Sequence, residues 1–122
     1  MATPQIEGVR FLQGLRNDGS IAAGATSVAF EDGDGTAVTM AQLHGKYGQN
    51  FNTLTVLNTD ADASVDLLLD GAFVQTIQSS NGAFTIESRD GIIYNTIAFK
   101  NIDSANTVAD NALRILVGRT GV

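Results

Sequence analysis

The sequence contains no cysteine and no tryptophan, and it has a single proline and a single histidine. The absence of cysteine excludes disulfides, thiolate metal sites and a cysteine nucleophile. With one histidine and no cysteine, the usual ligands of a zinc site are missing as well. No run of about 18 apolar residues is present, so the sequence predicts no membrane-spanning helix.

Charged residues are also scarce, at 16% of the chain, and acidic residues outnumber basic ones to give a net charge of −6. The seven basic residues are scattered along the sequence. A nucleic-acid partner needs a concentrated basic surface, so this pattern argues against direct nucleic-acid binding. The 122 residues correspond to one domain, long enough to bury a core of its own.

From residue 51 onward, apolar and polar residues alternate in short runs that are separated by turn residues. The alternation is clearest at 53–57, 65–69, 93–99 and 113–117. Asp70 and Gly71 stand between two such runs, and an Asp-Gly pair in this position predicts a hairpin turn. Turns about every 8 to 12 residues are typical of sandwiches and barrels. The sequence therefore predicts an all-β fold, an antiparallel jelly-roll-like sandwich of about eight strands.

The first half of the chain is less regular. Residues 25–30 and 36–40 are expected to form two strands joined by an acidic turn, and residues 40–47 a helical turn or an ordered loop. We divide the chain into residues 1–24, an N-terminal arm or strand, and residues 25–122, the sandwich domain.

The N-terminal segment combines arginines with apolar residues. These residues predict either an arm that docks on a neighbouring subunit or a strand of the same domain. The candidate contact residues are Arg10, Phe11, Leu12, Leu15 and Arg16.

The sequence also contains a weak internal repeat. Asn58, Asp60 and Val65 occur in the pattern Asn-x-Asp-x-x-x-Ser/Thr-Val, which recurs 43 residues later with Asn101 and Asp103. Asn and Asp side chains accept hydrogen bonds from nearby backbone amides in turns. The repeat predicts the same strand–turn–strand corner twice, which is a structural feature and not a chemical one.

No motif in the chain indicates a particular enzymatic reaction. The acidic turn with Asp32 and Asp34 does not have the ligand spacing of a calcium-binding helix–loop–helix, and we interpret it as a solvated turn. The acidic residues from Asp60 to Asp66 are more simply explained as turn caps than as a metal site. His44 has no nucleophile motif beside it. We expect no catalytic residue, no metal, no cofactor and no enzymatic activity.

Three leucines fall on the outward faces of predicted strands, namely Leu57, Leu68 and Leu116. One such residue is ordinary, but three indicate a second buried surface such as a subunit interface. We therefore expect the chain to associate with itself.

The stretches 54–65 and 97–121 resemble small structural proteins from the heads of tailed bacteriophages. The similarity lies in alternating strands that end in Asn-x-Asp, in the Leu69-Asp70-Gly71 hairpin, and in the closing strand from Leu113 to Arg119. The resemblance implies a capsid decoration (cement) protein with a sandwich or jelly-roll fold.

Such a protein sits on the capsid surface of the virion after assembly in the host cytoplasm, often as a trimer, and binds the major capsid protein. The family has no catalytic residues. The alternative function is a sugar- or receptor-binding module of a fibre or cell-surface protein.

Overall fold

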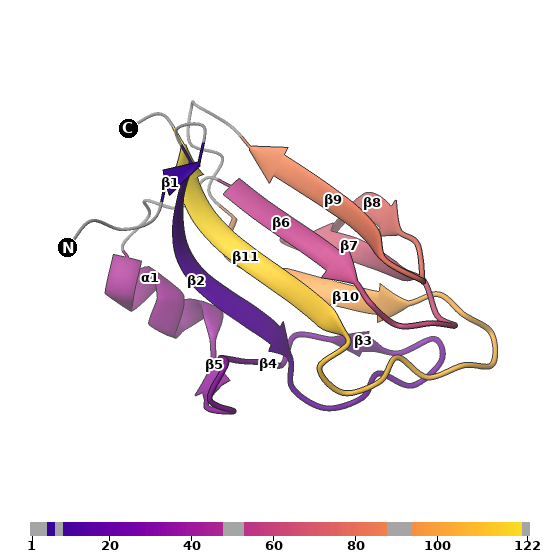
Figure 1. The fold of residues 1–122 in the computed structure, drawn as a ribbon. Helices are drawn as coiled ribbons and strands as arrows, with labels where there is room; N and C mark the ends of the chain where they lie inside the picture. Colours follow the sequence, from indigo (N-terminus) through magenta and orange to yellow (C-terminus); the bar gives the residue numbers. More distant parts are fainter. Residues whose placement is uncertain (1–4, 7–8, 48–52, 88–93, 121–122) are drawn as a thin grey trace.

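The computed structural model describes residues 5–6, 9–47, 53–87 and 94–120 (Figure 1). Within these ranges, eleven strands and one short helix form two antiparallel sheets, which confirms the all-β sandwich. The elements are β1 (Gln5–Ile6), β2 (Val9–Asn17), β3 (Thr26–Ser27), β4 (Phe30–Glu31), β5 (Ala37–Val38), α1 (Met40–Tyr47), β6 (Thr53–Asn58), β7 (Val65–Leu69), β8 (Ala72–Ile77), β9 (Gly82–Glu87), β10 (Ile97–Asn101) and β11 (Leu113–Thr120).

The strand order is that of a jelly roll. Sheet 1 has the order β5-β4-β2-β11-β6-β9, with β1 paired to β2, and sheet 2 has the order β3-β10-β7-β8. The pairs β2/β11, β3/β10, β6/β9 and β7/β8 are nested, so the first strand of the set pairs with the last and the innermost two pair with each other. This winding of eight strands into two sheets is the jelly-roll arrangement.

The three remaining strands have two residues each, and two of them occupy the connection between β3 and β6. The expected strand at 25–30 is instead divided, because the chain crosses between β3 in sheet 2 and β4 in sheet 1. The expected strand at 36–40 ends early, because Thr39 caps α1. The Thr39 Oγ1 accepts a hydrogen bond from the Gln42 amide, and the Gln42 Oε1 accepts one from the Thr39 amide. This reciprocal pair fixes the start of the helix.

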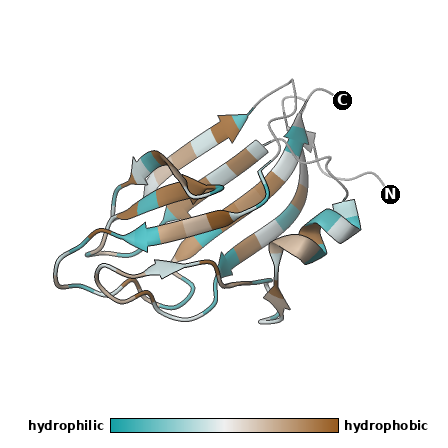
Figure 2. Ribbon diagram, turned by 180° about the vertical axis from the view of Figure 1, so that it is seen from behind, coloured by the Kyte–Doolittle hydropathy of each residue, from teal (hydrophilic) through white to brown (hydrophobic). Residues whose placement is uncertain are grey.

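The core lies between the two sheets. Buried and partly buried residues alternate along β6 and β7. Figure 2 shows the hydropathy of the residues along each strand. The largest fully buried side chains are Phe99, Leu54, Leu67, Ile77, Ile97, Leu113, Ile115, Val56, Val65, Val108 and Val117. Phe30 and Phe99 meet edge to face, with ring centroids 6.0 Å apart, and so link sheet 1 to sheet 2. Among the described residues no helix has the length and apolar character needed to cross a membrane.

The structure contradicts the interpretation of the N-terminal segment as an arm. Residues 9–17 form β2, an interior strand of sheet 1 that pairs with β11 on one side and with β4 on the other. Leu15 is 4% exposed and belongs to the core of its own sandwich, so its side chain is not available to a neighbouring subunit. The side chains of Arg10 and Phe11 and the first four residues lie outside the described part.

The two copies of the internal repeat form the corners at which the chain changes sheets. The chain passes from β6 in sheet 1 to β7 in sheet 2 at the first corner, and leaves β10 in sheet 2 towards β11 in sheet 1 at the second. Asn58 donates to the Ala63 carbonyl at 2.9 Å, and Asn101 donates to the Asn106 carbonyl at 2.8 Å. Each corner is therefore closed by a buried asparagine that bonds to the carbonyl five residues further on.

Candidate functional site

The candidate site lies on the outer face of sheet 1, by which we mean the side turned away from sheet 2. Strand register places side chains of this face in rows across β2, β11, β6 and β9. One row contains Arg16, Arg114, Leu57 and Ala83, and the next contains Gly14, Leu116, Thr55 and Thr85. Their neighbours along each strand, such as Leu15 and Ile115, point into the core. The outer face is therefore a mixture of arginine, leucine, threonine and very small residues.

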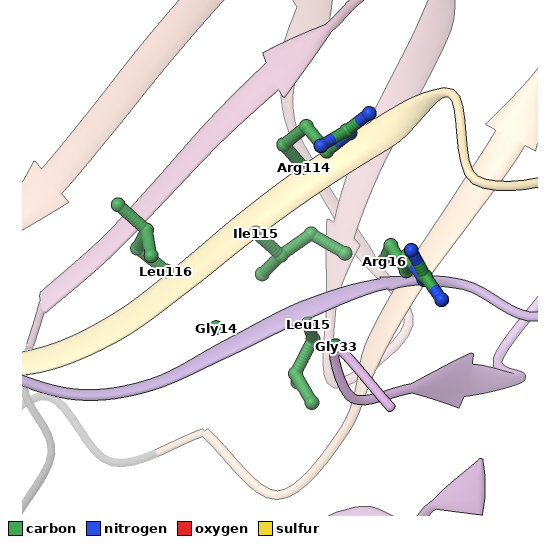
Figure 3. Close-up of a pocket in the computed structure, with 7 residues that line it drawn as sticks. All are labelled: Gly14, Leu15, Arg16, Gly33, Arg114, Ile115 and Leu116. Atoms are coloured by element: carbon green, nitrogen blue, oxygen red, sulfur yellow. The ribbon is translucent and has the colours of Figure 1, made fainter. Parts of the chain in front are cut away.

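A groove of about 500 Å³ crosses this face over β2 and β11 (Figure 3). Its lining residues are Gly14, Leu15, Arg16, Gly33, Arg114, Ile115 and Leu116. The hollow exists because Gly14 has no side chain, and a Cβ at that position would lie 3.5 Å from Leu116 Cδ2. Leu116 is 40% exposed, a high value for a leucine in the middle of a sheet.

Two arginines stand at one end of the groove. Arg16 and Arg114 are direct partners across β2 and β11, and like charges in opposed positions destabilise a sheet. The Glu31 carboxylate accepts a hydrogen bond from Arg16 Nε at 3.1 Å and forms an ion pair with it. Arg114 donates through Nε to the Asn111 carbonyl at 3.2 Å, which is a neutral acceptor. Among the described residues, the ion pair recorded at this end of the groove is that of Arg16 with Glu31, and Arg114 forms none.

The leucines expected at an interface separate into two groups. Leu57 and Leu116 lie together on the outer face of sheet 1, beside Arg114. Leu68 lies on the outer side of sheet 2, where its strand partners are Ala98 and Phe73. Phe73 is 61% exposed, so sheet 2 also carries an apolar side chain in solvent. Leu12 is half-buried and packs against the core.

The turn residues Asp70 and Gly71 form the β7–β8 hairpin, and both have positive φ, at 51° and 80°. The Asp70 Oδ1 also accepts hydrogen bonds from the amides of Asn95 and Thr96, at 2.8 and 2.9 Å. The side chain thus ties the hairpin to the start of β10.

The acidic turn residues bond to the backbone around them. The Asp32 Oδ1 accepts from the amides of Asp34 and Thr36. The Asp60 Oδ2 accepts from the amides of Asp62 and Ala63, and its Oδ1 accepts from the Ala109 amide at 2.9 Å. These carboxylates therefore organise turns with their own oxygens.

Hydrogen bonding moves the pKa of both corner aspartates. Burial acts to raise the pKa of Asp60, but the hydrogen bonds from the amides of Ala109, Ala63 and Asp62 outweigh it, so the pKa is lowered. The amides of Asn106 and Ala105 lower the pKa of the more exposed Asp103 in the same way. Both side chains act as structural anions at neutral pH.

Within the described residues, one acidic group has atoms close enough to hold a cation: Asp18, Glu31 and Asp110, whose carboxylate oxygens lie within 4.8 Å of one another. Sequence reasoning missed it because the three residues come from distant segments. Protein donors already serve two of its members, since Arg16 pairs with Glu31 and the Gly19 amide donates to Asp110 at 2.8 Å. We therefore treat the group as part of the sheet's own charge network.

No protein-family model, curated protein or solved structure matches this chain.

Proposed function

We propose that the chain is a structural protein of a tailed-phage virion that decorates and stabilises the capsid by binding the major capsid protein. The observation that carries the proposal is the outer face of sheet 1. Leu57 and Leu116 lie there beside Arg114, which forms no ion pair within the part of the chain that the structure describes. A face of this composition favours a protein partner, because it offers apolar area and charge together.

The fold supports the same proposal by analogy, since jelly rolls occur in viral capsid proteins. A decoration protein needs a stiff body and a broad contact surface, and it binds many equivalent sites on one shell. Modest affinity at each site then gives stable coverage through multivalency. We propose a homotrimer as the form that occupies the shell, in line with the resemblance to phage head proteins.

The test is co-sedimentation with empty capsids of the phage that encodes the chain, stripped of their decoration protein. We expect saturable binding and capsids that withstand a higher temperature before rupture. The double variant Leu57→Ser/Leu116→Ser is expected to remain folded and to bind weakly, whereas Leu68→Ser on sheet 2 is the matched control. Absence of binding by the unmodified protein would refute the proposal.

The alternative is a sugar- or receptor-binding module, since lectin domains also use jelly rolls. Sugar recognition usually relies on exposed aromatic faces. Tyr94 is buried, and the Tyr47 hydroxyl donates to the Leu12 carbonyl at 2.8 Å. The two tyrosines therefore support this alternative less well, and a glycan array measures it directly.

A further inference from the structure

Four strands lie at the edges of the two sheets, and three of them have features that hinder pairing with another chain. The strands β3 and β5 have only two residues each. The strand β8 contains a bulge, where its pairing with β7 shifts register between Leu67 and Leu68. Short strands and bulges both protect a sheet edge from further pairing.

The fourth edge strand, β9, has neither feature, since it pairs with β6 in unbroken register over all six of its residues (Figure 1). Within the part of the chain that the structure describes, no strand pairs with its other side. The Gly82 amide already donates to the Gln78 carbonyl at 3.2 Å. The open edge therefore extends from Ala83 to Glu87, with Thr85 at its centre. The backbone groups of such an edge are suited to bind another extended strand.

The core is also incompletely covered at β9. Phe84 lies opposite Val56 of β6, and both belong to the core. Ile86 and Leu54 form the next such pair. The two β6 side chains are fully buried, whereas the two β9 side chains are only partly buried. A strand added at this edge would cover both of them further, and burial of apolar surface favours association.

We propose that the β9 strands of two copies of this chain pair in antiparallel orientation about a twofold axis at Thr85, so that sheet 1 continues from one copy into the other. The axis is perpendicular to the sheet, so the core sides of both copies lie on the same side. Facing residues must then point in the same direction, and the register centred on Thr85 meets this condition. It places Phe84 of each copy opposite Ile86 of the other on the core side.

A second copy suits this edge because β9 is complementary to itself. The edge favours apolar side chains on the core side and a short polar side chain on the outer side, and β9 supplies both when it is read in reverse. The Thr85 hydroxyl lies 3.1 Å from that of Thr55 on the outer side. The pairing therefore extends a row of threonines across the axis, and cross-strand threonine pairs stabilise a sheet.

The net charge of −6 opposes association of two copies, but little of that charge lies at this contact. Glu87 is the one charged residue of β9, and the register places it opposite Ala83. The two copies of Glu87 are then about 14 Å apart, given a strand spacing of about 4.8 Å and a rise of about 3.3 Å per residue. This separation exceeds the Debye length of about 10 Å at 0.1 M salt. We therefore expect added salt to strengthen the contact.

The contact goes beyond the proposed function and does not depend on it. Because the axis is perpendicular to the sheet, the outer faces of both copies point in the same direction, and the pairing does not use Leu57 or Leu116. A twofold contact gives dimers from monomers and hexamers from trimers. Failure of the pairing does not bear on capsid binding, which is measured separately with shells.

The mass of the protein in solution is the first test. Light scattering on the full chain at about 50 μM and about 0.3 M salt is expected to give an even multiple of the 12.8 kDa protomer. The mass is expected to hold or to rise with further salt. An odd multiple, the monomer included, overturns the inference.

Charge substitutions at the axis test the register. Thr85→Lys and Thr85→Glu each place like charges opposite one another, so each variant alone is expected to halve the mass. An equal mixture of the two variants brings opposite charges together and is expected to restore the mass, which a folding defect would not do. Thr76→Lys makes the same change on the edge strand β8 and is the control that keeps the mass. A mixture that stays at half mass, or a control that falls as well, overturns the pairing.

The absence of cysteine permits a further test that does not rely on charge. Directly opposed residues of an antiparallel pair have Cα atoms about 4.5–5.5 Å apart, which is within reach of a disulfide. Thr85→Cys is therefore expected to form a disulfide-linked dimer on mild oxidation, and Thr76→Cys to remain a single chain. Equal cross-linking of the two variants, or none in Thr85→Cys, contradicts the inference.

Discussion

Asn58 and Asn101 lie 43 residues apart and hold two corners of the sandwich with the same hydrogen bonds. Each amide donates to the carbonyl five residues further on, and each Oδ1 accepts from the amide two residues further on. Both side chains are fully buried. The corners carry the chain between the sheets in opposite directions, so the jelly roll uses one local device to enter sheet 2 and to leave it.

Replacing either asparagine by alanine is expected to lower the free energy of unfolding by about 1–3 kcal/mol, because buried backbone groups lose their partners. We expect similar costs at Asn58 and Asn101, measured by urea denaturation. Asn95→Ala is the control, since that residue is exposed. A large loss of stability for the variant at one corner and none for the variant at the other would show that the two corners are not energetically equivalent.

The regular part of the fold follows from local signals. Strict alternation over 65–69 and 113–117 puts every second residue in the core, and the structure has strands at both places. The Asp70-Gly71 pair predicts its hairpin because both residues accept positive φ there. These signals need no knowledge of distant residues.

Strand β2 could not be recognised in the same way. Val117 pairs with Gln13 and Gly118 with Phe11, so Leu12 is an extra residue in a bulge. The bulge shifts the alternation by one position, which removes the period that identifies a strand. The groove could not be predicted from the sequence for a different reason. It depends on the pairing of Arg16 with Arg114, and these two positions are remote in the sequence.

Deletion of residues 2–17 is expected to abolish cooperative unfolding, contrary to the outcome expected of a free arm. The deletion removes an interior strand of sheet 1, so the edge of β11 that pairs with β2 loses its partner strand. Thermal unfolding followed by circular dichroism measures this. The substitution Leu15→Ala is expected to have a smaller effect and to lower the free energy of unfolding by about 2–5 kcal/mol. A truncated chain that still melts cooperatively would contradict the placement of β2.

Two glycines are expected to respond to alanine in opposite directions. A Cβ at Gly82 would lie 2.3 Å from the Gln78 carbonyl oxygen, and the backbone there cannot move aside. We expect Gly82→Ala to destabilise the fold by about 1–3 kcal/mol. Gly45 lies in α1 with open space around it, so Gly45→Ala is expected to stabilise the fold by about 0.5–1 kcal/mol. Melting temperatures that shift in the same direction for both variants would refute this reading of the two sites.

Burial raises the pKa of Tyr94 above its ordinary value of 10.0. A group with a raised pKa in the folded state contributes stability below its unfolded pKa, and this contribution is lost as pH rises past that value. Stability is therefore expected to fall above about pH 10, with a weaker fall in Tyr94→Phe. Urea midpoints between pH 9 and pH 11 measure the difference, and identical slopes for the two proteins would argue against it.

The lowered pKa of Asp60 predicts an acid-sensitive corner. A carboxyl group whose pKa is lower in the folded state than its unfolded value of 3.8 stabilises the fold above that value. This contribution is lost as the pH falls through the folded-state pKa. Asp60→Asn is expected to be less stable than the unmodified protein at pH 6 by about 1–3 kcal/mol, because its NH2 group opposes backbone donors.

The difference is expected to shrink as the pH falls below 3.8, since the unfolded chain then binds a proton at Asp60 and the stabilising contribution of the folded anion is lost. Urea midpoints of the two proteins between pH 6 and pH 2.5 give the comparison. Asp62→Asn is the matched control, because Asp62 is exposed and its neighbour Asp60 accepts the corner amides. A gap between Asp60→Asn and the unmodified protein that stays constant across this range would mean that geometry, and not ionisation, makes Asp60 necessary. In that case the hydrogen bonds from Ala63 and Ala109 would stabilise the corner equally well with a protonated partner.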